Sequence, residues 1–256
     1  MPYLPAMSDI LRLDRALVDR GLARSRTQAA QWIADERVEV GGVVTVKSAL
    51  KITADQAITV RPADGPEYVS RAGHKLAGAL EAFAEISVEG KRCLDAGAST
   101  GGFTDVLLRR GARQVAAVDV GHGQLVEILR ADPRVQVFEG VNVRYMDPAL
   151  IGGPAALTVC DLSFISLKLV VEPLTQATQP GGDLILMVKP QFEVGPERLG
   201  RTGVVTSEDQ RQEAVEGVVA AARAAGLVDR DRARSPLPGQ DGNHEFFLWL
   251  SRPQAG

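Results

Sequence analysis

Hydrophobic positions change their spacing along the chain, and this change predicts two parts of different architecture. At first, apolar side chains recur every three or four positions, which is typical of amphipathic helices. We predict one helix at 12–21 and a second that begins after Ser25, which caps it. The pattern then alternates around a Gly-Gly pair at 38–44, which predicts a β-hairpin, and a further strand is expected at 57–60. These elements predict a small α+β domain over residues 8–61.

From residue 70 onward, short apolar runs typical of buried strands alternate with stretches of helical periodicity. Helices are expected at 71–83, 103–110 and 207–225. Strands are expected at 91–95, 114–119, 135–138, 157–161, 183–189, 227–234 and 245–251. This alternation is typical of an α/β fold, in which helices cover both faces of a doubly wound, mostly parallel sheet of seven strands. We assign this second domain to residues 70–253, and the stretch 62–69, rich in proline, glycine and charge, to a linker.

A glycine-rich stretch joins the first strand of the second domain to the next helix. It contains Asp95 at the strand end, then Gly97 and the pair Gly101-Gly102, so it differs from the Gly-x-Gly-x-x-Gly spacing of dinucleotide-binding turns. Bare backbone at such a turn lets a ligand approach closely. The stretch resembles motif I of the Rossmann-like S-adenosylmethionine (AdoMet) methyltransferases. The resemblance implies that AdoMet is the cofactor and that it contacts Asp95, Gly97, Ala98, Ser99, Gly101, Gly102, Phe103 and Thr104.

Acidic and amide side chains follow the next strands. Asp119 ends the second strand, where Rossmann-type sheets place the acid that accepts hydrogen bonds from ribose hydroxyls. A solvated aspartate at a strand end is the alternative interpretation, because a fold does not fix a function. The resemblance also implies cofactor contacts for Val120, for Asn142 after the third strand and for Asp161 after the fourth. An ordinary turn asparagine is equally compatible with Asn142.

The bulk composition is that of a globular protein and argues against several classes. Of the 256 residues, 45% are hydrophobic and 24% charged, and no apolar run reaches membrane-spanning length. The net charge of −3 does not favour nucleic-acid binding by the whole chain, but residues 1–61 carry nine Lys or Arg against seven Asp or Glu. Any RNA-binding surface is therefore expected to be local.

Cysteine and histidine usage bears on the compartment and on metals. Cys93 and Cys160 both lie in predicted strands, which favours reduced core thiols and, with no secretory signal recognised, a cytoplasmic location. The three histidines, His74, His122 and His244, show no metal-ligand spacing with these cysteines. We therefore expect no metal site and no membrane partner.

Charged residues stand at several strand ends in the second half of this domain. Asp161 follows the fourth strand, Lys189 finishes the fifth and Glu245 opens the last. Pro190 prevents a helix from including Lys189 and holds that lysine extended, although a solvated lysine is the commoner case at a strand end. Together with Lys75 on the leading helix, these residues resemble the Lys-Asp-Lys-Glu tetrad of the FtsJ-like ribose 2′-O-methyltransferases.

Longer stretches narrow the resemblance to the TlyA (hemolysin A) family. They lie at residues 70–76, 95–104, 161–166, 188–193 and 242–250. The first domain is similar to the S4 RNA-binding domain through Arg12-Leu13-Asp14, Gly21-Leu22 and Ser25-Arg26. The S4 resemblance implies RNA-backbone contacts for Arg12, Arg15, Arg24 and Arg26. Solubilising surface arginines are the alternative.

The family resemblance implies ribose 2′-O-methylation of cytidine in 16S or 23S rRNA, with rRNA or ribosomal subunits as partners. A ribose hydroxyl is a weak acid, whereas the AdoMet sulfonium is already activated, so the site must align the two and help to remove a proton. We assign Lys189 to this deprotonation, Asp161 to orienting it, and Lys75 and Glu245 to completing the charge network. No Asn/Asp-Pro-Pro-Tyr/Phe turn, typical of enzymes that methylate amino groups, follows the fourth strand.

Two other functions stay open at this point. One is a membrane-acting hemolysin, as the family name suggests, although the sequence shows no spanning segment or strongly amphipathic basic helix. The other is an S4-type RNA-binding factor with an inactive methyltransferase fold, which the intact tetrad and glycine stretch disfavour. Phe164 and Phe192 are candidates for stacking on a nucleotide, although core packing is the commoner role of phenylalanine.

Overall fold

The computed structural model describes residues 10–62, 65–199, 202–239 and 242–254. The chain divides into two compact units, Met1–Glu67 and Tyr68–Gly256, and each is described by itself. Residues 8 and 9 of the predicted first domain and residues 63 and 64 of the predicted linker lie outside the described ranges. Tyr68 and Val69, at the end of that linker, belong to the second unit, where the Val69 amide donates to Asp105 Oδ2 at 2.9 Å.

The first unit contains the predicted helix–helix–hairpin arrangement. Its elements are β1 (Leu11–Arg12), α1 (Leu13–Asp19), α2 (Arg26–Ala34), β2 (Val38–Val40), β3 (Val43–Val44), β4 (Lys51–Ile52) and β5 (Ile58–Val60). Three strands form a sheet in the order β3-β2-β5, and β1 pairs antiparallel with β4. The β1–β4 pair has two residues per strand, too short for a hydrophobic period, so the sequence pattern does not reveal it.

The structure contains the two local features predicted for this unit, the Ser25 helix cap and the Gly-Gly hairpin turn. The Ser25 hydroxyl accepts from the Gln28 amide at 3.2 Å, as expected for a helix N-cap. The Gln28 side chain accepts from the Arg24 amide at 2.8 Å, one residue before the partner that a capping box predicts. Gly41 and Gly42 have φ of 58° and 81°, which is the left-handed geometry that a two-residue hairpin turn requires.

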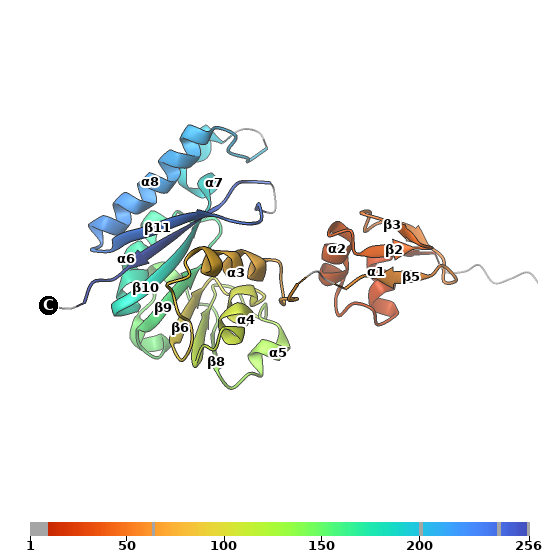
Figure 1. Cartoon of the computed structure of the whole chain (residues 1–256), viewed down its shortest axis with the longest axis horizontal. Helices are drawn as coiled ribbons and strands as arrows, with labels where there is room; N and C mark the ends of the chain where they lie inside the picture. The colour runs from red at the N-terminus through yellow and green to blue at the C-terminus, as the bar shows by residue number, and fades with distance from the viewer. Residues whose placement is uncertain (1–9, 63–64, 200–201, 240–241, 255–256) are drawn as a thin grey trace, which may run out of the picture. The chain divides into compact units, whose positions relative to one another are not determined.

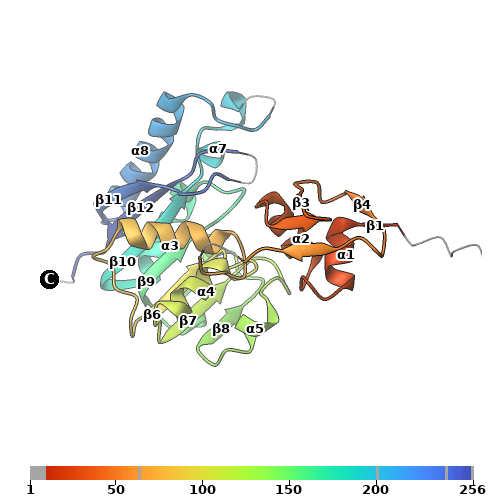
Figure 2. The ribbon, with the colours of Figure 1, turned by 45° about the vertical axis from the view of Figure 1, so that its right-hand side comes forward.

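The second unit is a seven-stranded sheet with helices on both faces (Figure 1 and Figure 2). Its strands are β6 (Arg92–Ala96), β7 (Gln114–Val118), β8 (Val135–Phe138), β9 (Ala155–Cys160), β10 (Thr178–Val188), β11 (Val228–Arg234) and β12 (Phe246–Ser251). Its helices are α3 (Ala72–Ala82), α4 (Gly102–Arg109), α5 (Glu127–Arg130), α6 (Val171–Gln176), α7 (Pro190–Glu193) and α8 (Glu208–Ala224). Short 3-10 turns are η1 (Val143–Tyr145), η2 (Pro148–Ile151), η3 (Leu167–Leu169) and η4 (Pro196–Arg198).

The strand order is β11-β12-β10-β9-β6-β7-β8, and only pairs that involve β12 are antiparallel among those described. This is the predicted doubly wound, mostly parallel architecture. β10 begins at Thr178, five residues before its predicted start at Asp183. The register with β9 shifts between these two residues, because the intervening Gln-Pro-Gly-Gly, which is typical of a turn, forms an irregularity inside the strand.

The sheet separates two apolar clusters. One contains Leu76 of α3 and Val106 of α4, and the other contains Leu174 of α6 and Val218 of α8. Neighbouring strand residues point to opposite faces and so enter opposite clusters. Cys93 and Cys160 are buried free thiols, as predicted, and burial raises the pKa of Cys93 to about 12.

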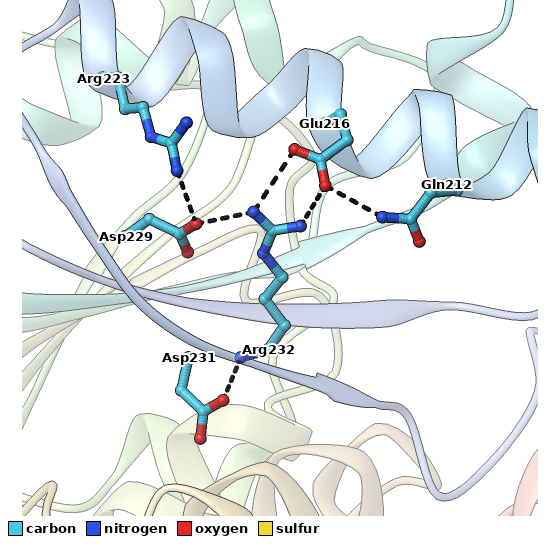
Figure 3. Close-up of polar contacts among 6 residues, drawn as sticks. All are labelled: Gln212, Glu216, Arg223, Asp229, Asp231 and Arg232. Atoms are coloured by element: carbon cyan, nitrogen blue, oxygen red, sulfur yellow. Dashed lines mark hydrogen bonds and ion pairs between the residues drawn. The ribbon is translucent and has the colours of Figure 1, made fainter.

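β11 forms one edge of the sheet and carries charges in place of apolar side chains. Arg232 lies 2.7 Å from Asp229 and 2.5 Å from Glu216 of α8, and Arg223 of α8 lies 3.4 Å from the same Asp229 (Figure 3). These contacts attach α8 to the edge strand. Charged edges disfavour pairing with strands of other molecules, so the network also explains why the sheet ends here.

Candidate active site

Three strand ends meet at one edge of the sheet. β10 is parallel to β9 and antiparallel to β12, with Val188 opposite Phe246. Because β12 runs in the reverse direction, its first residue lies beside the last residue of β10. The topology therefore brings Asp161, Lys189 and Glu245 to the carboxyl edge of the parallel strands. Open α/β sheets bind their ligands at this edge.

Lys189 has two polar partners. Its backbone is extended, with φ −112° and ψ 100°, as expected for a residue before proline. Its Nζ lies 2.6 Å from Asp161 Oδ1 and donates to the Ser163 hydroxyl at 2.9 Å. An ammonium group carries three protons. Only the Ser163 contact is a hydrogen bond, because Asp161 Oδ1 has no hydrogen-bond partner among the described residues and its contact with Lys189 is an ion pair.

Lys75 and Glu245 form the second lysine–carboxylate pair. Lys75 Nζ donates to Glu245 Oε2 at 2.5 Å, and both side chains are buried. The pair joins α3 to the start of β12, 170 residues further along the chain. A Cβ atom at Gly239 would lie 2.6 Å from Glu245 Oε1, so glycine at this position leaves room for the carboxylate.

Glu193 ties together the two segments that carry Asp161 and Lys189. The Ser166 hydroxyl donates to its carboxylate at 2.6 Å, and the Leu167 amide donates to it at 2.7 Å. Burial raises the pKa of Glu193, although these hydrogen bonds act in the opposite direction. The buried carboxylate therefore holds α7, which follows Lys189, against η3, which follows the Asp161 loop.

The glycine-rich turn follows β6 and leads into α4. Gly97 and Gly101 have φ of 90° and 102°, and Ser99 is also left-handed at 47°. A Cβ at Gly97 would lie 2.3 Å from the Asp161 carbonyl oxygen, and one at Gly101 would lie 2.3 Å from Leu129 Cδ1. These glycines are therefore required for close packing of the turn against the β9 loop and α5.

Other residues of the predicted cofactor turn have buried side chains. Gly102 would bring a Cβ to 2.3 Å from the Ser70 hydroxyl, so it also packs closely. Ala98, Phe103 and Thr104 bury their side chains in the unit. Contacts of these positions with a ligand would therefore come from the backbone, which fits a turn that receives its ligand on main-chain atoms.

Asp95 is fully buried beneath this turn. Its Oδ2 accepts from the Thr104 hydroxyl at 2.7 Å, whereas its Oδ1 has no hydrogen-bond partner among the described residues. Burial raises the pKa of Asp95 to about 7, and the nearby charge of Asp161 adds to this. A buried polar atom without a partner calls for an explanation, and a hydrogen-bond donor on a bound cofactor would supply one.

The end of β7 presents the predicted ribose-binding acid. Asp119 accepts from the Ser99 amide at 2.8 Å and from the Gly121 amide at 2.7 Å. Each carboxylate oxygen keeps a free lone pair, so the group fits two ribose hydroxyls as well. Val120 is exposed next to it. Asn142 is exposed too, and its side chain accepts from the Arg144 amide at 3.0 Å, capping η1 in the manner of a turn asparagine.

Two aromatic residues lie close in sequence to the Lys189–Asp161 pair. Phe164 has a left-handed backbone, φ 64°, and 91% of its surface is exposed. Its ring centroid lies 5.2 Å from that of Phe192 on α7. A bulky residue with positive φ is a strained conformation, and such exposure is unusual for phenylalanine.

The four predicted RNA-contacting arginines lie in the first unit, on or before α1 and α2. Arg12 and Arg26 both form ion pairs with Asp14, at 3.0 and 2.8 Å. Arg15 lies 3.4 Å from Asp19, and Arg24 is exposed. The structure therefore brings Arg12 and Arg26 together, although they are fourteen positions apart in the sequence.

Sequence reasoning did not assign a role to Ser163 or to the Glu193 carboxylate. Ser163 stands two residues after Asp161 and thus next to a recognised position, but a serine in a loop carries no signal of its contact partner. The residues that the sequence did predict, in the tetrad and in the cofactor turn, lie at the same edge of the sheet. Among the described residues, no helix is long and apolar enough to cross a membrane.

Comparisons with known proteins agree with this arrangement. Residues 68–252 match the FtsJ-like methyltransferase family, and residues 11–58 match the S4 domain. The chain is 51% identical over 93% of its length to the 16S/23S rRNA (cytidine-2′-O)-methyltransferase TlyA of Mycobacterium tuberculosis, covering 89% of that protein. It is 36% identical to Hemolysin A of Brachyspira hyodysenteriae, over 93% of this chain and 98% of the relative.

A solved structure from Streptococcus thermophilus resembles nearly the whole chain. It superposes with a TM-score of 0.75 at 38% identity, covering 97% of this chain and 91% of that one. Both units and their order are thus accounted for by one family. The chain belongs to the TlyA family, in which an S4 domain precedes an FtsJ-like methyltransferase domain.

Proposed function

We propose that this protein transfers a methyl group from AdoMet to the ribose 2′-hydroxyl of a cytidine in 16S or 23S rRNA. One observation carries the proposal most directly. Lys189 forms an ion pair with Asp161 and donates a hydrogen bond to Ser163 at the end of the parallel strands, where the Asp161 backbone packs against Gly97 of the glycine turn. This group is built to act on a proton next to a nucleoside cofactor.

The chemistry assigned to the chain is positioning and proton removal. AdoMet, when bound, supplies a methyl group on a sulfonium that needs no further activation. Asp161 and Ser163 would orient the Lys189 amine, whose lone pair would accept the proton of the ribose hydroxyl as the hydroxyl oxygen takes the methyl group and the sulfonium sulfur keeps the bonding electron pair. The Lys75–Glu245 pair completes the charge network from α3 and β12.

The cofactor is assigned to the turn and to three strand ends. Asp119 would hold the ribose hydroxyls, and Val120 and Asn142 would contact the adenine. Asp95 Oδ1 would accept from a donor on the methionine part. Main-chain atoms of residues 97–104 would line the remaining contact.

The RNA is assigned to two surfaces. Phe164, exposed directly after Ser163 in the chain, would stack on the target base, with Phe192 supporting its ring. Arg12, Arg15, Arg24 and Arg26 of the first unit would contact phosphates. Because a base in a helix is covered by its neighbours, the target nucleotide would be unstacked for the reaction.

The test is transfer of a tritiated methyl group from AdoMet to purified ribosomal subunits and to deproteinised rRNA. Labelled dinucleotides that resist alkaline hydrolysis are expected, because a 2′-O-methyl group blocks cleavage at that ribose. Label that is lost with alkali, or that appears on a base, would exclude the proposal. Failure to bind AdoMet would favour an RNA-binding factor without activity, and leakage of liposomes would favour a hemolysin.

A further inference from the structure

Asp14 is a buried carboxylate at the centre of the arginine surface. Only 4% of its surface is exposed, and it occupies the first turn of α1. Both the Nε and the Nη2 of Arg12 donate to it at 3.0 Å, and Arg26 Nη2 donates to it at 2.8 Å. These guanidinium groups hold the pKa of Asp14 at about 2, so that it stays ionised.

Arg12 and Arg26 are each held by Asp14, and each also remains partly exposed to solvent. The side chain of Arg12 is 48% exposed and that of Arg26 is 60% exposed. A guanidinium has five N–H donors, and Asp14 uses two from Arg12 and one from Arg26. The remaining donors lie on groups that already have fixed positions, at the spacing that a single shared carboxylate imposes.

Fixed arginines bind an anion more strongly than mobile ones. An unrestrained arginine loses rotamer freedom when it engages a phosphate, and this loss of side-chain entropy weakens binding. Asp14 meets this cost during folding for two arginines at once. Against this gain stands its own negative charge, which repels a polyanion and reduces the positive charge of the cluster.

We propose that Asp14 is a positioning residue for RNA: it presets Arg12 and Arg26 as a paired phosphate-binding site, and this effect outweighs its repulsion of the RNA backbone. The inference rests on the proposed function, because it requires that these arginines contact RNA. For the loss of Asp14, the inference predicts weaker RNA binding, whereas an argument from net charge alone predicts tighter binding. Removing the acid makes the domain more positive, and yet binding should weaken.

The experiment compares Asp14→Asn with Asp35→Asn in the full-length protein. Asp35 follows α2 and is exposed, and its contact is with Gln31 rather than with an arginine, so both variants change the charge equally. Filter binding to deproteinised 16S and 23S rRNA is measured over a series of KCl concentrations. We expect about five- to tenfold weaker binding for Asp14→Asn and equal or tighter binding for Asp35→Asn.

The salt dependence gives a second readout. The slope of log K against log salt is negative, and each lost phosphate contact reduces its magnitude by about 0.7–0.9. Asp14→Asn should therefore reduce the magnitude of the slope, whereas Asp35→Asn should not. Binding by Asp14→Asn that is as tight as wild type, or tighter, would overturn the inference.

The variant Arg12→Gln/Arg26→Gln separates the inference from the proposed function. If this double variant binds rRNA like wild type, the arginine surface itself is wrongly assigned. If it binds weakly, adding Asp14→Asn should cause no further loss, because the carboxylate then has no guanidinium to position. A further loss in this background contradicts the inference.

Folding of the first unit is checked in each variant through Trp32, whose ring lies 5.0 Å from the Arg37 guanidinium. Trp249, in the second unit, is replaced by Phe in all proteins compared. If Asp14→Asn proves unfolded, Asp14→Glu is measured instead, because it keeps the charge and displaces the contact by one methylene. Wild-type affinity in folded Asp14→Glu would count against the inference.

Discussion

The two lysine–carboxylate pairs of the second unit have nearly the same length but different surroundings. Lys75 and Glu245 lie 2.5 Å apart, and the Glu245 side chain is only 3% exposed. Lys189 and Asp161 lie 2.6 Å apart, and the Asp161 side chain is 17% exposed. Lys189 also has a hydroxyl partner, Ser163. The two lysine side chains are 10% and 11% exposed, so the difference lies in the carboxylates; we call Lys75–Glu245 the closed pair and Lys189–Asp161 the open pair.

This difference separates two uses of the same chemistry. Burying an ion pair costs desolvation that its attraction rarely exceeds, so the closed pair is poorly explained by stability alone. It joins α3 to β12 and fixes a positive and a negative charge behind the site. The open pair can meet a substrate, because among the described residues Lys189 donates a hydrogen bond only to Ser163 and keeps hydrogen-bonding capacity for a further group.

The largest expected effect comes from removing the open lysine. Lys189→Met should lower the rate of methyl transfer at least about 10³-fold, as expected for loss of a group that handles the proton. Single-turnover transfer of labelled methyl to rRNA measures the rate, and calorimetric titration with AdoMet should give an unchanged affinity. Lys75→Met is the matched variant and should lose less. A reversed order would exchange the roles of the two lysines.

The closed pair should dominate stability. Glu245→Gln leaves the Lys75 ammonium buried without a countercharge, and we expect a loss of about 3 kcal/mol in the free energy of unfolding. Asp161→Asn should cost about 1 kcal/mol or less, because water reaches that pair more easily. Urea unfolding measures both. The double variant Lys75→Met/Glu245→Gln should regain most of the lost stability. Equal losses of stability for Glu245→Gln and Asp161→Asn would contradict the distinction between the closed and the open pair.

Ser163 should matter for the rate and little for binding. Ser163→Ala removes one of the two groups that orient the Lys189 amine, so kcat is expected to fall by about tenfold with little change in KM. Ser163→Thr keeps a hydroxyl at the same place and should recover most of the activity. A purely structural role predicts instead that both variants melt earlier and that neither is rescued.

The last prediction concerns a pH dependence of stability. Burial raises the pKa of Asp95 to about 7, and the negative charge of Asp161 contributes. The folded protein thus holds a proton that the unfolded chain releases near the ordinary value of about 4, so stability from this group falls as pH rises from about 4 to 7. Asp95→Asn should flatten the difference curve in urea unfolding. Asp161→Asn should lower the pKa of Asp95 and so lower the upper limit of the pH range over which stability falls. If this upper limit does not change, Asp161 has no influence on Asp95.

Much of the architecture is visible before any coordinates. Alternation of apolar runs and helical periods predicts the parallel sheet because every strand of such a sheet is buried. The Ser25 cap, the Gly41-Gly42 turn and the extended Lys189 before Pro190 follow from local backbone constraints, which act within a few residues. The irregular start of β10 was predicted wrongly, since Gln-Pro-Gly-Gly has the local preferences of a turn and only pairing with β9 keeps it in the strand.

The sequence by itself determined which residues are able to do chemistry: the tetrad types, the glycine spacing and the arginines of the first unit. The tertiary structure decided which of them meet. Lys75 reaches Glu245 across 170 positions, Asp14 joins Arg12 to Arg26, and Ser163 becomes a partner of Lys189 only because β9 and β10 are neighbours. Local preferences act over a few bonds, whereas these contacts depend on strand order and on the direction of β12, which no local pattern encodes.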